Sequence, residues 1–191
     1  MQNLILHAYI KQVSKRIADE DLPLLASCAV SRGLKRGELL LKEGEVCREI
    51  YLVKSGYLRT YYNKEGELIN LNFAFEGDFT TNLQSIRSKQ KSDFTIEAGE
   101  DSLVWIFNLD KINERFNANP QVISFIRRLA IYILLASEEH STLFKLYTPT
   151  ERYRYIEKSK PQLLQRISLS QLASYLGVAR ETLSRIRAKK S

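Results

Sequence analysis

The chain has 191 residues, of which 44% are apolar, and a formal net charge of +7. This length can bury a proper core in one large or two small domains. The longest uninterrupted apolar run, Leu129 to Ala136, falls far short of the roughly 20 residues that span a bilayer, so we expect no membrane span. The N-terminus has neither the basic start nor the long apolar stretch of a signal peptide, and Cys28 and Cys47 read as reduced thiols of a cytoplasmic protein.

The positive charge lies at one end of the chain. Residues 150–191 hold ten Lys or Arg and three acidic residues, which accounts for the whole net charge and leaves residues 1–149 neutral. A neutral body with one cationic end indicates a polyanion bound at that end. DNA fits this role better than membrane lipid, because the terminal helix lacks the broad apolar face of an interfacial anchor.

The first two thirds of the chain combine short helices with strands. Residues 4–26 have helical spacing interrupted at Pro23, which predicts one or two N-terminal helices. From Arg36 to Phe107, short apolar segments alternate with glycine-containing turns, as in an antiparallel sandwich or barrel. The predicted strands are Ile50–Val53, Tyr57–Tyr62, Leu68–Phe73, Phe94–Ala98 and Leu103–Phe107, and the predicted turns are centred on Gly37, Gly44, Gly56, Gly66 and Gly77.

A long helix is predicted after Pro120. Apolar positions recur at alternating steps of three and four, which is typical of a seam that packs on another helix and predicts a dimer. The alternative is that this helix covers the barrel, and additional isoleucines and Leu134 make its apolar surface wide enough for both roles. The polar residue Glu139 would weaken the seam locally or mark where the two helices splay. Thr148-Pro149 breaks the helical pattern and predicts a hinge before the basic end of the chain. The seam consists of Val122, Phe125, Leu129, Tyr132, Ala136, Glu139, Leu143 and Leu146.

The basic end reads as a helix-turn-helix over residues 169–187. Five apolar residues have the spacing that buries one face of each helix: Leu172, Leu176, Val178, Leu183 and Ile186. Ala173 is small where the two helices must cross closely. Gly177 suits a left-handed residue between the helices, and Ser170 is the predicted cap of the first helix.

The second helix carries side chains suited to DNA. Arg180 and Arg185 can each donate two hydrogen bonds to guanine, and Glu181 can accept one from cytosine, so we predict that these three contact bases. The predicted contacts to the DNA backbone are Thr182, Ser184, Arg187 and Lys189. The alternative is a small amphipathic helix pair with a solvated basic face, in which Glu181 and Arg185 form a surface ion pair.

The order of these elements resembles the CRP/FNR family of bacterial transcription regulators. The resemblance rests on Lys35-Arg-Gly-Glu38, Glu43-Gly-Glu45, Ile50-Tyr-Leu-Val-Lys-Ser-Gly56, Glu76-Gly-Asp-Phe79 and the run Arg180-Glu-Thr-Leu-Ser-Arg185. It implies a cyclic-nucleotide-binding-like β-roll, a dimerisation helix and a helix-turn-helix. In that family the residues that correspond to Arg180, Glu181 and Arg185 contact bases.

The chain departs from this family where a cyclic phosphate is normally held. Thr81 and Asn82 stand in place of the family's Gly-Glu, and Ser92-Asp93 stands in place of its Arg-Ser or Arg-Thr pair. An aspartate would repel a phosphate, so we expect that cyclic AMP does not bind in the usual way. A divergent effector pocket would use Thr81, Asn82, Arg87 and Ser92. Arg87, Lys89 or Lys91 could supply a displaced positive charge there, but the favoured interpretation of these three cations is a solvated loop face.

Other family features also differ. Two cysteines cannot supply the four thiolates of an iron–sulfur cluster, and His7 and His140 are poor candidates for a haem ligand, so no cofactor is predicted. The β-hairpin wing that follows the recognition helix in well-known members is expected to be missing, with fewer backbone contacts. Nothing in the sequence indicates an enzyme, since it has no phosphate-binding glycine loop, metal-binding histidine pair or nucleophile elbow.

The predicted fold is α+β. It comprises N-terminal helices with an antiparallel β-roll (residues 1–108), a central dimerisation helix region (109–148) and a helix-turn-helix domain (149–191). The predicted function is that of a cytoplasmic, homodimeric, sequence-specific DNA-binding regulator, controlled by an effector other than cyclic AMP or by none. RNA polymerase is a candidate partner. The alternative is a cyclic-nucleotide-binding-like module that binds a ligand or a protein without specific DNA binding.

Overall fold

The computed structural model describes residues 27–116 and 119–188, and the helices predicted within residues 4–26 lie outside this range. Contacts divide the chain into two compact units. Unit 1 takes in the chain up to Arg59 together with Ala74–Ile133, and unit 2 combines Thr60–Phe73 with Leu134–Ser191. This division differs from the boundaries drawn from the sequence pattern at residues 108 and 148, because the last turns of the long helix and one β-hairpin pack with the C-terminal helices.

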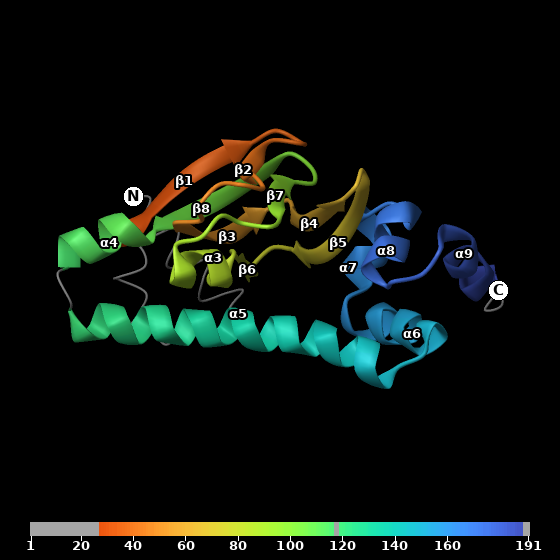
Figure 1. The fold of residues 1–191 in the computed structure, drawn as a ribbon. Coiled ribbons are helices and arrows are strands. Elements are labelled where there is room, and N and C mark those ends of the chain that lie inside the picture. The colour runs from red at the N-terminus through yellow and green to blue at the C-terminus, as the bar shows by residue number, and fades with distance from the viewer. Residues whose placement is uncertain (1–26, 117–118, 189–191) are drawn as a thin grey trace. The chain divides into compact units, whose positions relative to one another are not determined.

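Within residues 27–116 and 119–188, eight strands form two four-stranded sheets (Figure 1). The first sheet has the order β1-β8-β3-β6 and the second the order β2-β7-β4-β5, so the predicted antiparallel β-roll is confirmed. Each of the five predicted strands coincides with an observed one. The strands are β1 (Ala29–Leu34), β2 (Leu39–Leu41), β3 (Glu49–Ser55), β4 (Leu58–Lys64), β5 (Glu67–Ala74), β6 (Phe79–Thr80), β7 (Thr95–Ala98) and β8 (Ser102–Asn108).

Glycine makes the tight connections between these strands, as predicted. The glycine of each of the five predicted turns has a positive φ, which L side chains rarely adopt. Gly56 shows a second reason for the residue type, because a Cβ at this position would lie 2.2 Å from the hydroxyl oxygen of Ser102. Both the backbone conformation and the space therefore require glycine there.

The core of unit 1 lies on both faces of the first sheet. Along β3, Tyr51 and Val53 belong to one buried cluster, which includes residues of the second sheet, while Ile50 and Leu52 belong to another. This alternation follows from the two-residue period of a strand. The cluster around Ile50 and Leu52 also contains Trp105 of β8, which is 4% exposed and is a core residue.

Helices complete both units. Unit 1 contains α3 (Leu83–Ser88), α4 (Leu109–Phe116) and the first part of α5 (Pro120–Leu146), and unit 2 contains the rest of α5 with α6 (Pro149–Ser159), α7 (Pro161–Arg166), α8 (Leu169–Tyr175) and α9 (Arg180–Ala188). Among the described residues, no helix is long and apolar enough to cross a membrane.

The predicted seam on α5 is partly buried within the chain, whereas its members Ala136 and Leu146 are exposed. Val122 and Leu129 are only 3% and 4% exposed because they pack against strands of the same chain, and the Tyr132 ring meets Phe79 edge-on at 5.9 Å. The alternative, that this helix covers the barrel, is correct for these positions. A different set of apolar side chains, Ile131, Leu134 and Leu135, is 49–60% exposed. A heptad pattern shows that a helix face is buried, but not whether the same chain or a second copy buries it.

Candidate nucleic-acid interface

The first helix of the helix-turn-helix begins at a capping box. The hydroxyl of Ser168 accepts a hydrogen bond from the backbone N–H of Gln171 at 3.2 Å, and the Gln171 side chain accepts one from the backbone N–H of Ser168 at 3.0 Å. The prediction that Ser170 caps this helix is therefore wrong. Only Ser168 has the extended backbone of a cap residue, whereas Ser170 already lies in the first turn.

The turn between the two helices is fixed at Gly177, as predicted. Its φ is +64°, and a Cβ would lie 2.6 Å from a ring carbon of Phe144. The guanidinium of Arg152 donates a hydrogen bond to the carbonyl of Leu176 at 2.9 Å and lies over the Phe144 ring at 4.3 Å. Sequence analysis missed Arg152, because neither its position nor its neighbours mark it as a turn-holding residue.

A compact apolar core holds the two helices together. Leu172, Ala173, Leu176 and Leu183 are at most 2% exposed, which confirms the predicted inner face. Val178 and Ile186 are half-buried. The helices that precede the motif contribute Tyr153, Ile156, Leu163 and Ile167, all buried. Because Leu183 is the one fully buried residue that α9 adds, most of this helix remains accessible.

The predicted DNA-contacting side chains share the accessible side of α9. Arg180, Glu181 and Arg185 are all exposed, as are Thr182, Ser184 and Arg187. Lys189, the remaining predicted contact, lies outside the described residues. Within the described part of the chain no salt bridge joins Glu181 to Arg185, so their polar groups are available to another molecule.

The junction between α5 and α6 is a hydrogen-bonded corner. Thr148 caps α6 in a second capping box with Glu151, Pro149 occupies the first helical turn, and the Arg152 guanidinium donates to the Tyr147 carbonyl at 3.0 Å. The predicted hinge at Thr148-Pro149 thus corresponds to a helix break that several side-chain contacts hold in one geometry.

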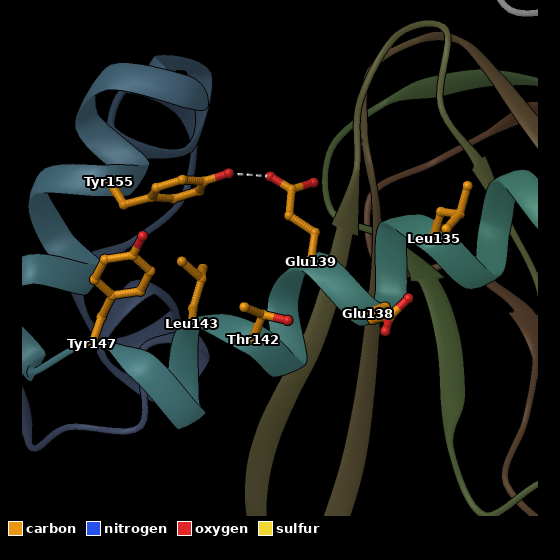
Figure 2. A pocket seen from close by; sticks show the side chains of 7 residues that line it. All are labelled: Leu135, Glu138, Glu139, Thr142, Leu143, Tyr147 and Tyr155. Carbon is orange, nitrogen blue, oxygen red and sulfur yellow. Dashed lines mark hydrogen bonds between the residues drawn. The ribbon is translucent and has the colours of Figure 1, made fainter.

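A pocket of about 320 Å³ lies beside this corner (Figure 2). The hydroxyl of Tyr155 reaches across it to the carboxylate of Glu139 at 2.5 Å, and Lys160 approaches the same carboxylate at 3.7 Å. The hydrogen bond to Glu139 raises the pKa of Tyr155, with a smaller contribution from burial. Glu139 therefore joins α5 to α6 and α7 within one chain, in contrast to the predicted position on a dimer seam. The lining residues are Leu135, Glu138, Glu139, Thr142, Leu143, Tyr147 and Tyr155.

His140 packs inside unit 2. Its ring stacks on Tyr175 with centroids 4.2 Å apart and meets Phe144 edge-on, and its Nε2 lies 3.2 Å from the carbonyl oxygen of Tyr175. Burial is the main cause that lowers the pKa of this imidazole. The side chain thus ties α5 to the end of α8.

Three of the four predicted effector residues lie together in the roll. Thr81, Asn82 and Ser92 are at most 9% exposed. Asn82 caps α3 and donates to the Ser92 hydroxyl at 2.8 Å, while Thr81 donates to the carbonyl of Glu49 at 2.6 Å. Arg87 is exposed on α3 and is not part of this hydrogen-bonded group. Asn82 and Ser92 thus bond to each other, and Thr81 bonds to the backbone of β3.

These elements define a class: a β-roll joined through a long helix to a domain that presents a helix-turn-helix. Residues 31–119 match the family model of the cyclic nucleotide-binding domain. The predicted resemblance is confirmed, because the chain is similar in sequence to two curated regulatory proteins and shares its fold with a solved regulator of the CRP/FNR family.

Two curated relatives and one further solved structure illustrate these similarities. The chain is 26% identical to the anaerobic regulatory protein of Pasteurella multocida (strain Pm70) and 25% identical to the fumarate and nitrate reduction regulatory protein of Yersinia pestis, over 80% of its own length in both cases. It spans only 60% and 65% of those relatives. The structure of FixK2 from Bradyrhizobium japonicum shares the fold with a TM-score of 0.70 and 21% identity, covering 84% of this chain and 83% of that one.

Proposed function

We propose that this protein is a sequence-specific DNA-binding transcription regulator that acts as a homodimer. The observation that carries the proposal is the accessible row of Arg180, Glu181 and Arg185 on the second helix of a well-packed helix-turn-helix. The names of the two curated relatives, both regulatory proteins, support the same class.

The chemistry of α9 suits the major groove. A recognition helix contacts base edges with residues near its N-terminus, and Arg180 and Glu181 are its first two residues here. Arg185 lies one turn beyond Glu181 and can reach the next base pairs. Thr182, Ser184, Arg187 and Lys189 would contact phosphates and fix the register without reading the sequence.

A second copy would supply the second half-site. The exposed apolar side chains Ile131, Leu134 and Leu135 follow one another at helical spacing on α5, and they offer a surface that a twofold-related α5 could cover. Two recognition helices can then contact half-sites about 34 Å apart. This proposal keeps the predicted dimer helix but moves its contact face to these residues.

Control of this regulator would not use cyclic AMP in the manner of the family's cyclic-nucleotide-binding members. Thr81, Asn82 and Ser92 pair with the chain itself, and Arg87 is exposed on α3, outside this hydrogen-bonded group. We propose that the effector differs chemically from cyclic AMP, or that the protein has no effector.

The proposed site of action is the cytoplasm, and RNA polymerase is the proposed partner in transcription.

The salt dependence of DNA binding tests the proposal. Binding of the purified protein to duplex DNA should weaken steeply with salt, since each neutralised phosphate changes the slope of log K against log salt by about −0.9. Arg187→Gln should make this negative slope less steep by about 0.9. Lys42→Gln changes an exposed lysine of the roll and should leave the slope unchanged. Weak, salt-insensitive binding would instead favour the ligand- or protein-binding module.

A further inference from the structure

The pocket beside the α5–α6 corner has features that the proposed function does not use. Its volume of about 320 Å³ falls within the range of small-molecule sites, roughly 300–1,000 Å³. All of its lining residues belong to unit 2, so the pocket lies within one compact body. Carboxylate and hydroxyl groups line it together with leucine and tyrosine side chains (Figure 2). A few polar groups among apolar walls are typical of a site that orients a ligand and covers its apolar part.

The carboxylate of Glu138 is an unpaired charge at this pocket. Glu138 and Glu139 are consecutive and are the only acidic residues of α5. Glu139 accepts the hydrogen bond from Tyr155, and the ammonium of Lys160 lies 3.7 Å from it. The Glu138 side chain, in contrast, makes no ion pair or hydrogen bond with any residue that the structure describes. The lining therefore carries one uncompensated negative charge, which suits a ligand with a single positive charge.

Two tyrosines give the pocket an aromatic end. The rings of Tyr147, at the corner, and Tyr155, on α6, have centroids 6.1 Å apart and planes inclined by 31°. Figure 2 shows both rings beside Leu143, whereas Leu135 lies at the other end. A cation is attracted to a tyrosine face within about 6 Å of the ring centroid. Leu135 is also part of the proposed dimer face, so a second copy would lie at that end of the pocket.

Two hydroxyl groups narrow the chemistry of the cation. The side-chain hydroxyls of Thr142 and Tyr147 have no hydrogen-bond partner among residues 27–116 and 119–188. A primary ammonium donates three hydrogen bonds, which these hydroxyl oxygens and the Glu138 carboxylate can accept, whereas a quaternary ammonium has no N–H to donate. A hard metal ion prefers a shell of several oxygen ligands and gains little from apolar walls. The lining thus fits a primary ammonium on an apolar body.

We propose that this pocket is a binding site for a small organic cation, in which a primary ammonium group is attached to an apolar or aromatic body. The ammonium binds the carboxylate of Glu138, and the body packs on Leu143 and on the rings of Tyr147 and Tyr155. The bound cation joins α5 to α6 in addition to the bond between Tyr155 and Glu139. The site is separate from the effector residues predicted in the roll, since those belong to unit 1.

Titration calorimetry of the full chain with 2-phenylethylammonium tests the proposal. Two ligands with the same ring serve as comparisons: 2-phenylethanol, which is neutral, and 3-phenylpropionate, which is an anion. Glu138→Gln removes the charge and keeps the size of an exposed side chain, so the variant is expected to fold. Glu114→Gln is the matched control, since it makes the same change at an exposed position of α4 in unit 1. Tyr147→Leu removes the ring and the hydroxyl but keeps an apolar side chain, and amide chemical shifts locate the bound ligand.

We expect the wild type to bind 2-phenylethylammonium about tenfold or more tightly than either comparison ligand. Glu138→Gln should weaken this binding about tenfold or more, as for the loss of a hydrogen bond between charged groups, and Tyr147→Leu about threefold. Glu114→Gln should have no effect, and the shift changes should include the amides of Thr142 and Leu143.

The proposal is overturned if the wild type does not bind the ammonium or binds all three ligands equally. It is also overturned if Glu138→Gln or Tyr147→Leu binds like the wild type, or if the shift changes are confined to unit 1. The measurement contains no DNA, so its outcome does not depend on the proposed regulator function.

Discussion

The hydroxyl of Tyr155 on α6 donates a 2.5 Å hydrogen bond to Glu139 on α5, and this bond joins the long helix to the C-terminal helices (Figure 2). We predict that Tyr155→Phe lowers the free energy of unfolding by about 1 kcal/mol, the usual net value of such a bond. Tyr147→Phe is the control, since it removes the hydroxyl of the ring packed beside Tyr155. Denaturant unfolding measures both, and equal effects of the two substitutions would contradict a special role for the Tyr155–Glu139 bond.

The same bond gives stability a dependence on alkaline pH. The pKa of Tyr155 is raised in the folded chain, mainly by the hydrogen bond to Glu139, so the folded state retains the proton longer than the unfolded state. Stability from this group is present below the unfolded pKa of about 10 and is lost as pH rises through the folded pKa. In Tyr155→Phe this part of the alkaline slope should disappear, which a series of melting curves above pH 9 would detect.

His140 should make the protein less stable in mild acid. Its pKa is lowered in the folded chain, chiefly by burial, so the unfolded state binds a proton first as pH falls below about 6.5. The nearby charges are Glu139, which opposes this shift, and Lys160 and Arg152, which add to it. Melting temperatures between pH 7.5 and 5 should fall less for His140→Gln than for the wild type. His7→Gln is the control with the chain's other histidine, and equal slopes for His140→Gln and wild type would refute the prediction.

The two faces of α5 should respond differently to substitution. Leu134 is 60% exposed, and Leu134→Glu should shift the proposed dimer toward monomer without a loss of monomer stability. Leu129 is buried under the roll, so Leu129→Ala should cost about 2–5 kcal/mol of stability. Sedimentation velocity and thermal unfolding distinguish these outcomes. A Leu134→Glu protein that remains fully dimeric would show that the contact face lies elsewhere.

The sequence predicted those parts of the fold that depend on local signals. Glycine-marked turns and alternating strands identified the roll, and the short spacing around Gly177 identified the helix-turn-helix. The helix cap was placed two residues too late, because Ser168 and Ser170 are the same residue type and only the backbone conformation distinguishes them. Part of the predicted seam on α5, including Val122 and Leu129, is buried by the same chain, because periodicity reports burial without identifying the partner.

Contacts between distant polar residues could not be predicted. The backbone N–H of Asn70 donates to the hydroxyl of Ser174, which is 104 positions away, and neither side chain is unusual for a surface strand or helix. The pairing of Asn82 with Ser92 is similar, since neither residue carries a local signal that it contacts the other. Such contacts depend on the register of packed elements, and a single sequence holds no local signal for this register.

Substitutions on α9 should separate reading of bases from contact with phosphates. Arg180→Ala is expected to cost about 1–3 kcal/mol at one base pair of each half-site and little at other positions. Arg187→Ala should weaken binding about equally on all sequences, because a phosphate contact carries no sequence information. Competition binding against a set of single-base variants measures both. Uniform weakening by Arg180→Ala would reassign this residue to the DNA backbone.

The most direct test of the account is selection of bound sequences from random duplex DNA by the purified protein. We predict a twofold symmetric motif with half-site centres one helical turn apart, and loss of its preferred bases when Arg180, Glu181 and Arg185 are replaced together by alanine. Enrichment of no sequence, or of the same sequence by the triple variant, would contradict the claim that α9 reads DNA.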